Sequence, residues 1–263
     1  MADFRAVRQR TRAGELVLYP AQPLEGSARP VVVFLHGAWR GAGVFEPWAD
    51  LLADVADVVL VDLPGHGRSE AIASASVAAM ADCVHEALRT ALPGRRVLLV
   101  GESLGGLIAL TIAGEAGCEP VKAVFAADPP FTTTKLWSVG QTVRRHVGLG
   151  SLSEFAIQLA KESFGISGEA VEEIVYYPLV GKLRLPTVIA TGDLALMPPR
   201  RVDGLTSLFD SVDRFVLEQL YPGKVEIQQL SDCGHLLLID AKDRCLQIIK
   251  SMLAKHLADS PTR

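Results

Sequence analysis

The chain has 263 residues, enough for one large domain with a full hydrophobic core and a small added segment. Apolar residues make up 49% of it, and the formal net charge of −4 gives no electrostatic case for a nucleic-acid partner. No apolar run has the length of a membrane span, and no basic N-terminal segment leads into the apolar core of a secretion signal.

The cysteines show no spacing typical of a metal site, so they predict free thiols in a reducing compartment. They are Cys83, Cys118, Cys233 and Cys245. We therefore expect a cytoplasmic protein with no metal and no cofactor. No nucleic-acid or membrane partner is expected, and a homodimer is left open.

Strand and helix signals alternate along most of the chain. Residues 4–8 and 15–19 predict an antiparallel hairpin at a sheet edge. The elements expected next are strand 31–35, helix 46–54, strand 57–61, helix 75–91, strand 96–100, a helix after Ser103, strands 121–127, 185–191 and 225–230, and a final helix 240–257. Such alternation implies right-handed crossovers and a mostly parallel sheet with helices on both faces.

Residues 131–184 interrupt the alternation. They contain three helix-like segments, near 135–147, 153–163 and 169–177. An insertion at this point lies over the carboxyl edge of the sheet, where open α/β folds bind ligands. We interpret it as a helical lid on a core domain made of residues 1–130 and 185–263. Its apolar side chains, Trp137 among them, either face the substrate or form the lid's own small core.

The pentapeptide Gly101-Glu102-Ser103-Leu104-Gly105 carries the strongest chemical signal. It lies between the apolar strand 97–100 and a helix that begins near 106. A serine on so sharp a turn has strained backbone and an exposed hydroxyl, and the glycines avoid clashes that a Cβ would make. We interpret Ser103 as a nucleophile. The alternative is a glycine-rich turn that only lets the helix pack close to the sheet.

Two further motifs follow predicted strands. His36-Gly37-Ala38-Trp39 ends the run 30–35, and residues 62–69 form an Asp-x-Pro-Gly-x-Gly-x-Ser turn after strand 58–61. With Gly-x-Ser-x-Gly and the late Gly234-His235, they resemble the α/β-hydrolase superfamily, in its serine-nucleophile branch with a helical lid. The resemblance implies an eight-stranded, mostly parallel sheet covered by helices on both faces, with a small helical lid. It is specific for the fold and unspecific for the substrate.

An acyl-transfer site also needs a base and donors for the oxyanion. His235 is the candidate base, because its loop emerges at the same sheet edge as Ser103. Leu104 supplies one backbone N–H for the oxyanion, and by resemblance Ala38 supplies the other. Trp39 and Trp137 are expected to wall the substrate pocket. His36 is expected to fix the oxyanion loop, and His66 to brace its own turn.

The acid that orients the base is where the sequence departs from the family. Similar chains carry the acid after the strand near 185–191, at the position that is Ala195 here, and a methyl group cannot orient an imidazole. Asp128 ends the preceding strand, where some family members carry their acid. Asp193 lies in the usual loop but two residues early. We favour Asp128, with Asp193 as the alternative and a site with no acid, or with water in its place, as the third.

These residues predict a cofactor-independent, carboxylesterase-like serine hydrolase that acts on a small ester or related acyl compound. A second hypothesis keeps the same residues but assigns carbon–carbon bond hydrolysis, a lyase reaction or a peroxidase reaction. A third hypothesis, suggested by Ala195, is a ligand-binding protein with a degenerate triad.

Overall fold

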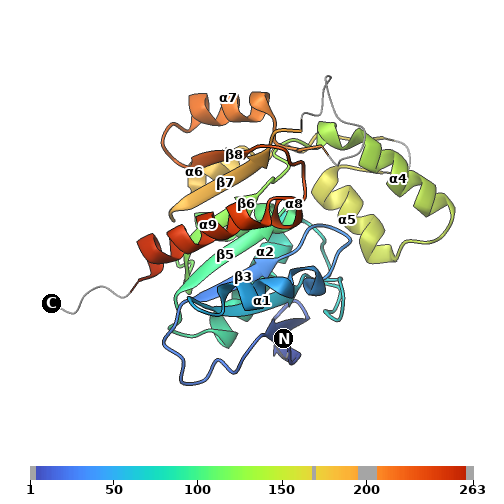
Figure 1. The fold of residues 1–263 in the computed structure, drawn as a ribbon. Helices are drawn as coiled ribbons and strands as arrows, with labels where there is room; N and C mark the ends of the chain where they lie inside the picture. The colour runs from blue at the N-terminus through green and yellow to red at the C-terminus, as the bar shows by residue number, and fades with distance from the viewer. Residues whose placement is uncertain (1–3, 168–169, 195–205, 259–263) are drawn as a thin grey trace.

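One eight-stranded sheet forms the centre of the molecule. The computed structural model of the chain describes residues 4–167, 170–194 and 206–258 (Figure 1). The sheet order is β1-β2-β4-β3-β5-β6-β7-β8. The strands are β1 (Val7–Arg10), β2 (Glu15–Pro20), β3 (Val31–Leu35), β4 (Asp57–Asp62), β5 (Val97–Glu102), β6 (Val121–Ala127), β7 (Thr187–Gly192) and β8 (Glu226–Leu230). β2 pairs antiparallel with β1 and β4, and the other pairs are parallel. The predicted eight-stranded, mostly parallel sheet is confirmed.

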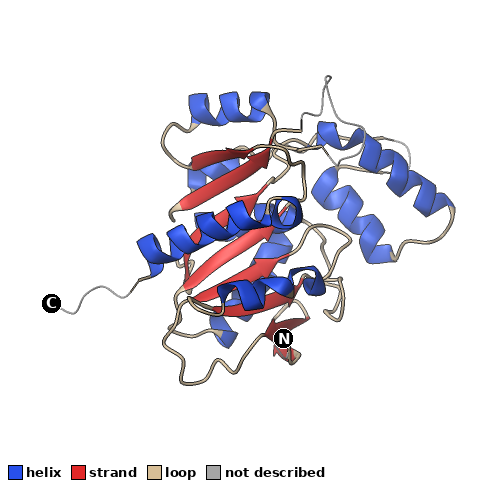
Figure 2. Ribbon diagram, in the orientation of Figure 1, coloured by secondary structure: helices blue, strands red, loops and turns tan. Residues whose placement is uncertain are grey.

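Helices cover both faces of this sheet (Figure 2). Side chains of β3 alternate between two hydrophobic clusters, with Val31, Val33 and Leu35 in one and Val32 and Phe34 in the other. The first cluster includes α2 (Val77–Ala91) and α3 (Leu104–Gly114), and the second includes α1 (Pro47–Leu52), α8 (Leu237–Asp240) and α9 (Lys242–Met252). The continuous apolar strands of the sequence are thus buried on both faces.

The insertion contains two of the three helices predicted for it. η2 (Thr133–Leu136), α4 (Trp137–Gly148) and α5 (Glu154–Phe164) lie beside the sheet at one end (Figure 1). The predicted helix near 169–177 is wrong, because residues 170–176 are not helical and Tyr177 is the N-cap of α6 (Pro178–Lys182). Ile174 donates its N–H to Thr133 Oγ1 at 2.8 Å, and Tyr176 donates to Phe131 O at 2.8 Å. These hydrogen bonds to Thr133 and Phe131 hold the segment in a non-helical conformation, which its β-branched residues also favour.

The sequence analysis missed one helix after β7 and merged others near the C-terminus. α7 (Ser211–Leu220) begins with a capping box in which Asp210 and Asp213 bind each other's backbone N–H. The predicted helix 240–257 is instead α8, α9 and the π-helical turn η3 (Leu253–Leu257). No helix among the described residues is long and apolar enough to cross a membrane.

The glycines around Ser103 allow the backbone of α3 to approach two strands. A Cβ on Gly101 would lie 2.1 Å from Gly105 O, and a Cβ on Gly105 would lie 2.2 Å from Leu35 O. Both contacts are with backbone atoms, which cannot rotate away as a side chain can. The sequence-based explanation of these glycines is therefore confirmed.

We expect Gly105→Ala to destabilise the protein strongly, although alanine is the better helix former. The added methyl group would force α3 away from β3, and differential scanning calorimetry should show a much lower Tm or no cooperative transition. Gly148→Ala is the matched control, because a Cβ at that helical glycine meets nothing within 4 Å. An unchanged Tm in Gly105→Ala would contradict this packing argument.

Candidate active site

Ser103 lies on a strained turn between β5 and α3. Its φ of 55° and ψ of −116° are rare for a residue with a side chain. Ser103 donates its N–H to Ala127 O at 2.9 Å, and its own carbonyl accepts from Leu107 N at 3.1 Å. Neighbouring backbone on both sides therefore fixes the turn that directs the Ser103 side chain toward a cavity.

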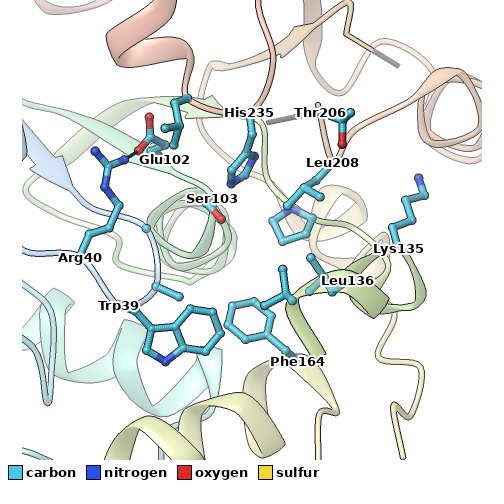
Figure 3. Close-up of a pocket in the computed structure, with 15 residues that line it drawn as sticks. Trp39, Arg40, Glu102, Ser103, Lys135, Leu136, Phe164, Thr206, Leu208 and His235 are labelled. Atoms are coloured by element: carbon cyan, nitrogen blue, oxygen red, sulfur yellow. Dashed lines mark hydrogen bonds and ion pairs between the residues drawn. The ribbon is translucent and has the colours of Figure 1, made fainter. Parts of the chain in front are cut away.

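That cavity has a volume of about 260 Å³, and Ser103 and His235 lie on the same wall of it (Figure 3). The imidazole of His235 points toward the Ser103 side chain. Most of the remaining wall is apolar. It consists of Ala38, Trp39, Pro130, Leu136, Val139, Phe164, Leu208 and Leu236.

His235 and Asp128 are hydrogen-bonded although they are far apart in sequence. His235 Nδ1 lies 2.6 Å from Asp128 Oδ2, and both side chains are buried. In a neutral imidazole that donates from Nδ1 to a carboxylate, Nε2 carries no proton and can accept one. Asp193 is exposed, and its Oδ1 accepts from Cys233 N at 3.3 Å. Ala195 lies outside the described residues.

The segment after β7 holds the Asp128 carboxylate in place. Leu208 N donates to Oδ2 at 2.7 Å, while Phe209 N and Thr191 Oγ1 each lie 3.3 Å from Oδ1. Ser207 Oγ also donates to Oδ1. Sequence analysis missed these supporting groups, because no motif marks Ser207 or Leu208. The polar Thr191 at the end of an apolar strand was the only available signal.

The loop after β3 packs directly against the nucleophile turn. A Cβ on Gly37 would lie 3.3 Å from Ser103 Cβ, which is tighter than most real Cβ contacts, so glycine lets the loop approach the serine this closely. Ala38 lies on the cavity wall, and Leu104 is the first residue of α3. Ala38 and Leu104 therefore both lie next to the Ser103 turn in the fold, and their role as N–H donors stays a prediction.

Two histidines connect this loop to the turn after β4. His66 Nε2 accepts from Trp39 N at 3.1 Å, and its Nδ1 donates to Pro64 O at 2.9 Å. His36 Nε2 accepts from Leu63 N at 3.1 Å, and its Nδ1 donates to Gly37 O at 2.7 Å. His66 braces its own turn through Pro64 O, as expected, and it also bonds the loop after β3 through Trp39 N.

The two tryptophans expected at the pocket differ in what the structure describes. Trp39 lies on the cavity wall with a φ of 58°, and its ring centroid is 5.6 Å from that of Phe164 in α5. Trp137 begins α4, and its side chain is outside the described set. Among the described residues, no cluster of three or more His, Cys, Asp or Glu side chains is arranged to hold a metal ion.

A family model of the alpha/beta hydrolase fold matches residues 30–144. A pimeloyl-[acyl-carrier protein] methyl ester esterase of Chromobacterium violaceum is 41% identical over 114 residues, which are 43% of this chain and 42% of that protein. The enzyme of the same name from Yersinia pseudotuberculosis serotype O:1b is 28% identical over 74% of this chain and 77% of its own length.

Solved structures share the whole fold at lower identity. E-2-(acetamidomethylene)succinate hydrolase has a TM-score of 0.72 and 20% identity, covering 96% of this chain and all of its own. The carboxylesterase CesB from Bacillus subtilis has a TM-score of 0.70 and 15% identity, covering 96% of this chain and 92% of its own. The match of the family model and the similarity to these solved structures show that the chain has the α/β-hydrolase fold.

The buried histidines predict a loss of stability in acid. Burial lowers the pKa of His36 from 6.5 to about 4 and also lowers the pKa of His66. Between about pH 6.5 and 4 the unfolded chain therefore binds more protons than the folded chain, and stability falls as the pH drops through this window. Urea unfolding from pH 8 to 4.5 should show this fall.

The variant His36→Gln removes one of these protonation sites. It should be less stable than the wild type at pH 8 but should lose less further stability on acidification. His146→Gln, at an exposed histidine of α4, is the control and should keep the wild-type pH dependence. An equally steep acid loss in His36→Gln would assign the effect to other groups.

Proposed function

We propose that this chain is a cofactor-independent, carboxylesterase-like serine hydrolase that cleaves small, uncharged esters. The observation that carries the proposal is the 2.6 Å hydrogen bond from His235 Nδ1 to Asp128 Oδ2, beside the serine of the strained turn. A nucleophile, a base and an orienting acid then meet at the carboxyl ends of β5 and β6 and in the loop after β8.

In the proposed reaction, Ser103 Oγ attacks the ester carbonyl while His235 Nε2 takes its proton. The Ala38 and Leu104 N–H groups donate to the oxyanion of the tetrahedral intermediate. His235 then gives the proton to the leaving alcohol, and an acyl-enzyme remains on Ser103. A water molecule, deprotonated by His235, attacks this acyl group and releases the acid, after which Ser103 regains its proton.

The charges on the cavity wall favour an uncharged substrate. Arg40 is paired with Glu102, and Lys135 is paired with Asp213 and, at 3.0 Å, with Asp210. These cations are already neutralised by protein carboxylates, so they offer little attraction to a charged ligand. The apolar remainder of a cavity of about 260 Å³ suits a short acyl chain.

The insertion 131–184 is proposed to act as the lid of this cavity. Leu136 in η2, Val139 in α4 and Phe164 in α5 contribute side chains to the wall. The contact between Phe164 and Trp39 joins the insertion to the loop after β3. The length and shape of acyl chain accepted would then depend on these helices.

The named relatives favour ester cleavage over the other reactions. Two of them are methyl ester esterases, and CesB is a carboxylesterase. Among the described residues, no contact in the site specifically favours carbon–carbon bond hydrolysis, a lyase reaction or a peroxidase reaction. The hypothesis of a degenerate binding protein rested on Ala195, and a carboxylate supplied by Asp128 removes the reason for it.

The nucleophile is tested with a fluorophosphonate probe and a panel of p-nitrophenyl esters. Wild-type protein should be labelled and should hydrolyse short, uncharged esters, because Ser103 would be activated by His235. Ser103→Ala should lose both activities while its Tm stays near the wild-type value. Labelling that persists in Ser103→Ala would place the nucleophile elsewhere, and Ser153→Ala, at the cap of α5, is the control.

The acid is tested by comparing Asp128→Asn with Asp193→Asn. An amide at 128 favours the wrong histidine tautomer, which in a serine protease slows turnover about ten-thousand-fold. We expect Asp128→Asn to lower kcat by a factor of about 10²–10⁴ and Asp193→Asn by less than about threefold.

Asp128→Asn should also lower the Tm, because the four donors after and within β7 would meet an amide instead of a carboxylate. Activity must therefore be measured below the unfolding range. If Asp193→Asn were the inactive variant, the acid would lie on the later loop. Full activity in both variants would mean that His235 acts without an orienting acid.

A further inference from the structure

Arg40 and Glu102 form an ion pair directly beside the proposed catalytic serine. Glu102 is the last residue of β5 and precedes Ser103, while Arg40 follows Trp39 in the loop after β3. Arg40 Nη1 contacts Glu102 Oε2, and their side chains are 21% and 0% exposed (Figure 3). The pair therefore joins the nucleophile turn to the loop that carries Ala38.

A carboxylate at this position is costly for the fold. Burial raises the pKa of Glu102, while the charge of Arg40 opposes that rise. Oε1 is buried and has no hydrogen-bond partner among the described residues. An apolar pair of similar volume is often no less stable than a buried ion pair. Stability alone is therefore a weak explanation for these two charges.

The position of the pair indicates what it does. Two anchored positions of the loop follow Ala38 directly: Trp39, whose N–H donates to His66, and Arg40, which meets Glu102. Trp39 has a φ of 58°, so the loop follows a backbone path that side-chain residues seldom adopt. A loop with such a path needs external contacts to stay in register with Ser103.

Glu102 also has a neighbour on the opposite side. The backbone N–H of Leu238, in α8 just after the His235 loop, is a further group that opposes the rise in the Glu102 pKa caused by burial. Figure 3 shows the Glu102 carboxylate directed toward Arg40 rather than into the space before Ser103. Glu102 is therefore placed to hold neighbouring segments and not to touch the substrate.

We propose that Arg40 and Glu102 are positioning residues that hold the loop after β3 where the Ala38 N–H can donate to the oxyanion. This inference rests on the function proposed above. Removing one oxyanion donor costs about 10²–10³ in kcat in a serine protease. A donor that remains present but drifts should cost part of that amount, with little effect on binding of the ground-state ester.

The experiment combines steady-state kinetics with hydrogen–deuterium exchange of the loop peptide 36–45. Arg40→Met and Glu102→Gln should each lower kcat at least tenfold with KM within about threefold, and each should speed exchange in the loop. Arg40→Lys, which can still pair with Glu102, should recover much of kcat. The matched control is Arg95→Met, because Arg95 pairs with the buried Asp57 at 2.6 Å at the opposite end of β4.

The control variant should have a lower Tm but unchanged kcat and unchanged exchange in the loop. The double variant Arg40→Met/Glu102→Met removes both charges, so it should recover Tm relative to Arg40→Met while kcat stays low. Recovery of kcat together with Tm would show that the pair serves only stability and would overturn the proposal. Unchanged loop exchange in the single variants would also overturn it.

The exchange measurement does not depend on turnover. If wild-type protein neither hydrolyses esters nor reacts with fluorophosphonate, the proposed function fails. Faster loop exchange in Arg40→Met and Glu102→Gln would then still show that the pair holds the loop, whereas unchanged exchange would reject the pair's role as well.

Discussion

The hydrogen bond between His235 and Asp128 joins segments 107 residues apart, and the proposed chemistry depends on it. It forms because β6 ends beside β5, with Ala127 opposite Glu102 in the register. Ser103 N donates to Ala127 O. Ser103 and Asp128 therefore each come directly after one residue of the Glu102–Ala127 pair, at the ends of neighbouring strands. A shift of this register by one residue would separate the serine from the carboxylate.

The position of Asp128 changes the part played by the segment after β7. The resembled family usually carries its acid in this loop, whereas here Ser207, Leu208 and Phe209 donate hydrogen bonds to Asp128, the proposed acid, which directly follows β6. Asp128 has a φ of 47°, a conformation that needs support from its surroundings. The donors supply that support and fix which oxygen faces His235, so the loop is still required by the proposed triad.

The sequence predicted the fold well where short-range signals were strong. Apolar runs mark strands that are buried on both faces, and glycines such as Gly105 mark close contact with neighbouring backbone. Both kinds of constraint can be recognised from a few adjacent residues. The helix α7 was missed although Asp210 and Asp213 form a capping box. Its apolar residues Val212 and Phe215 are exposed, so the helix does not show the usual pattern of apolar residues on one face only. The segment 170–177 was wrongly predicted because its form depends on bonds to Phe131 and Thr133, about forty residues earlier.

The site was predictable only in part for the same reason. Motifs named Ser103, His235 and the loop with Ala38, and the strand order placed Asp128 near them. No local pattern indicated that Arg40 would meet Glu102, or that His36 and His66 would each bond the other's segment. These contacts depend on how two loops fold onto each other, which neither loop's sequence specifies alone.

The contacts around the cavity have a common electrostatic consequence. Burial lowers the pKa of His36 and His66, and each of them accepts a backbone N–H, which requires an unprotonated ring nitrogen. Arg40 and Lys135 are paired with carboxylates. The proposed oxyanion would therefore develop next to fixed backbone dipoles rather than next to a free charge. Dipoles that are already oriented need not reorganise as the charge appears, which is the condition under which they stabilise a transition state most. The rigidity of the loop after β3 would then matter more for catalysis than the net charge of the site. The contacts of Trp39 and of the buried Glu102 are the ones that keep this loop rigid.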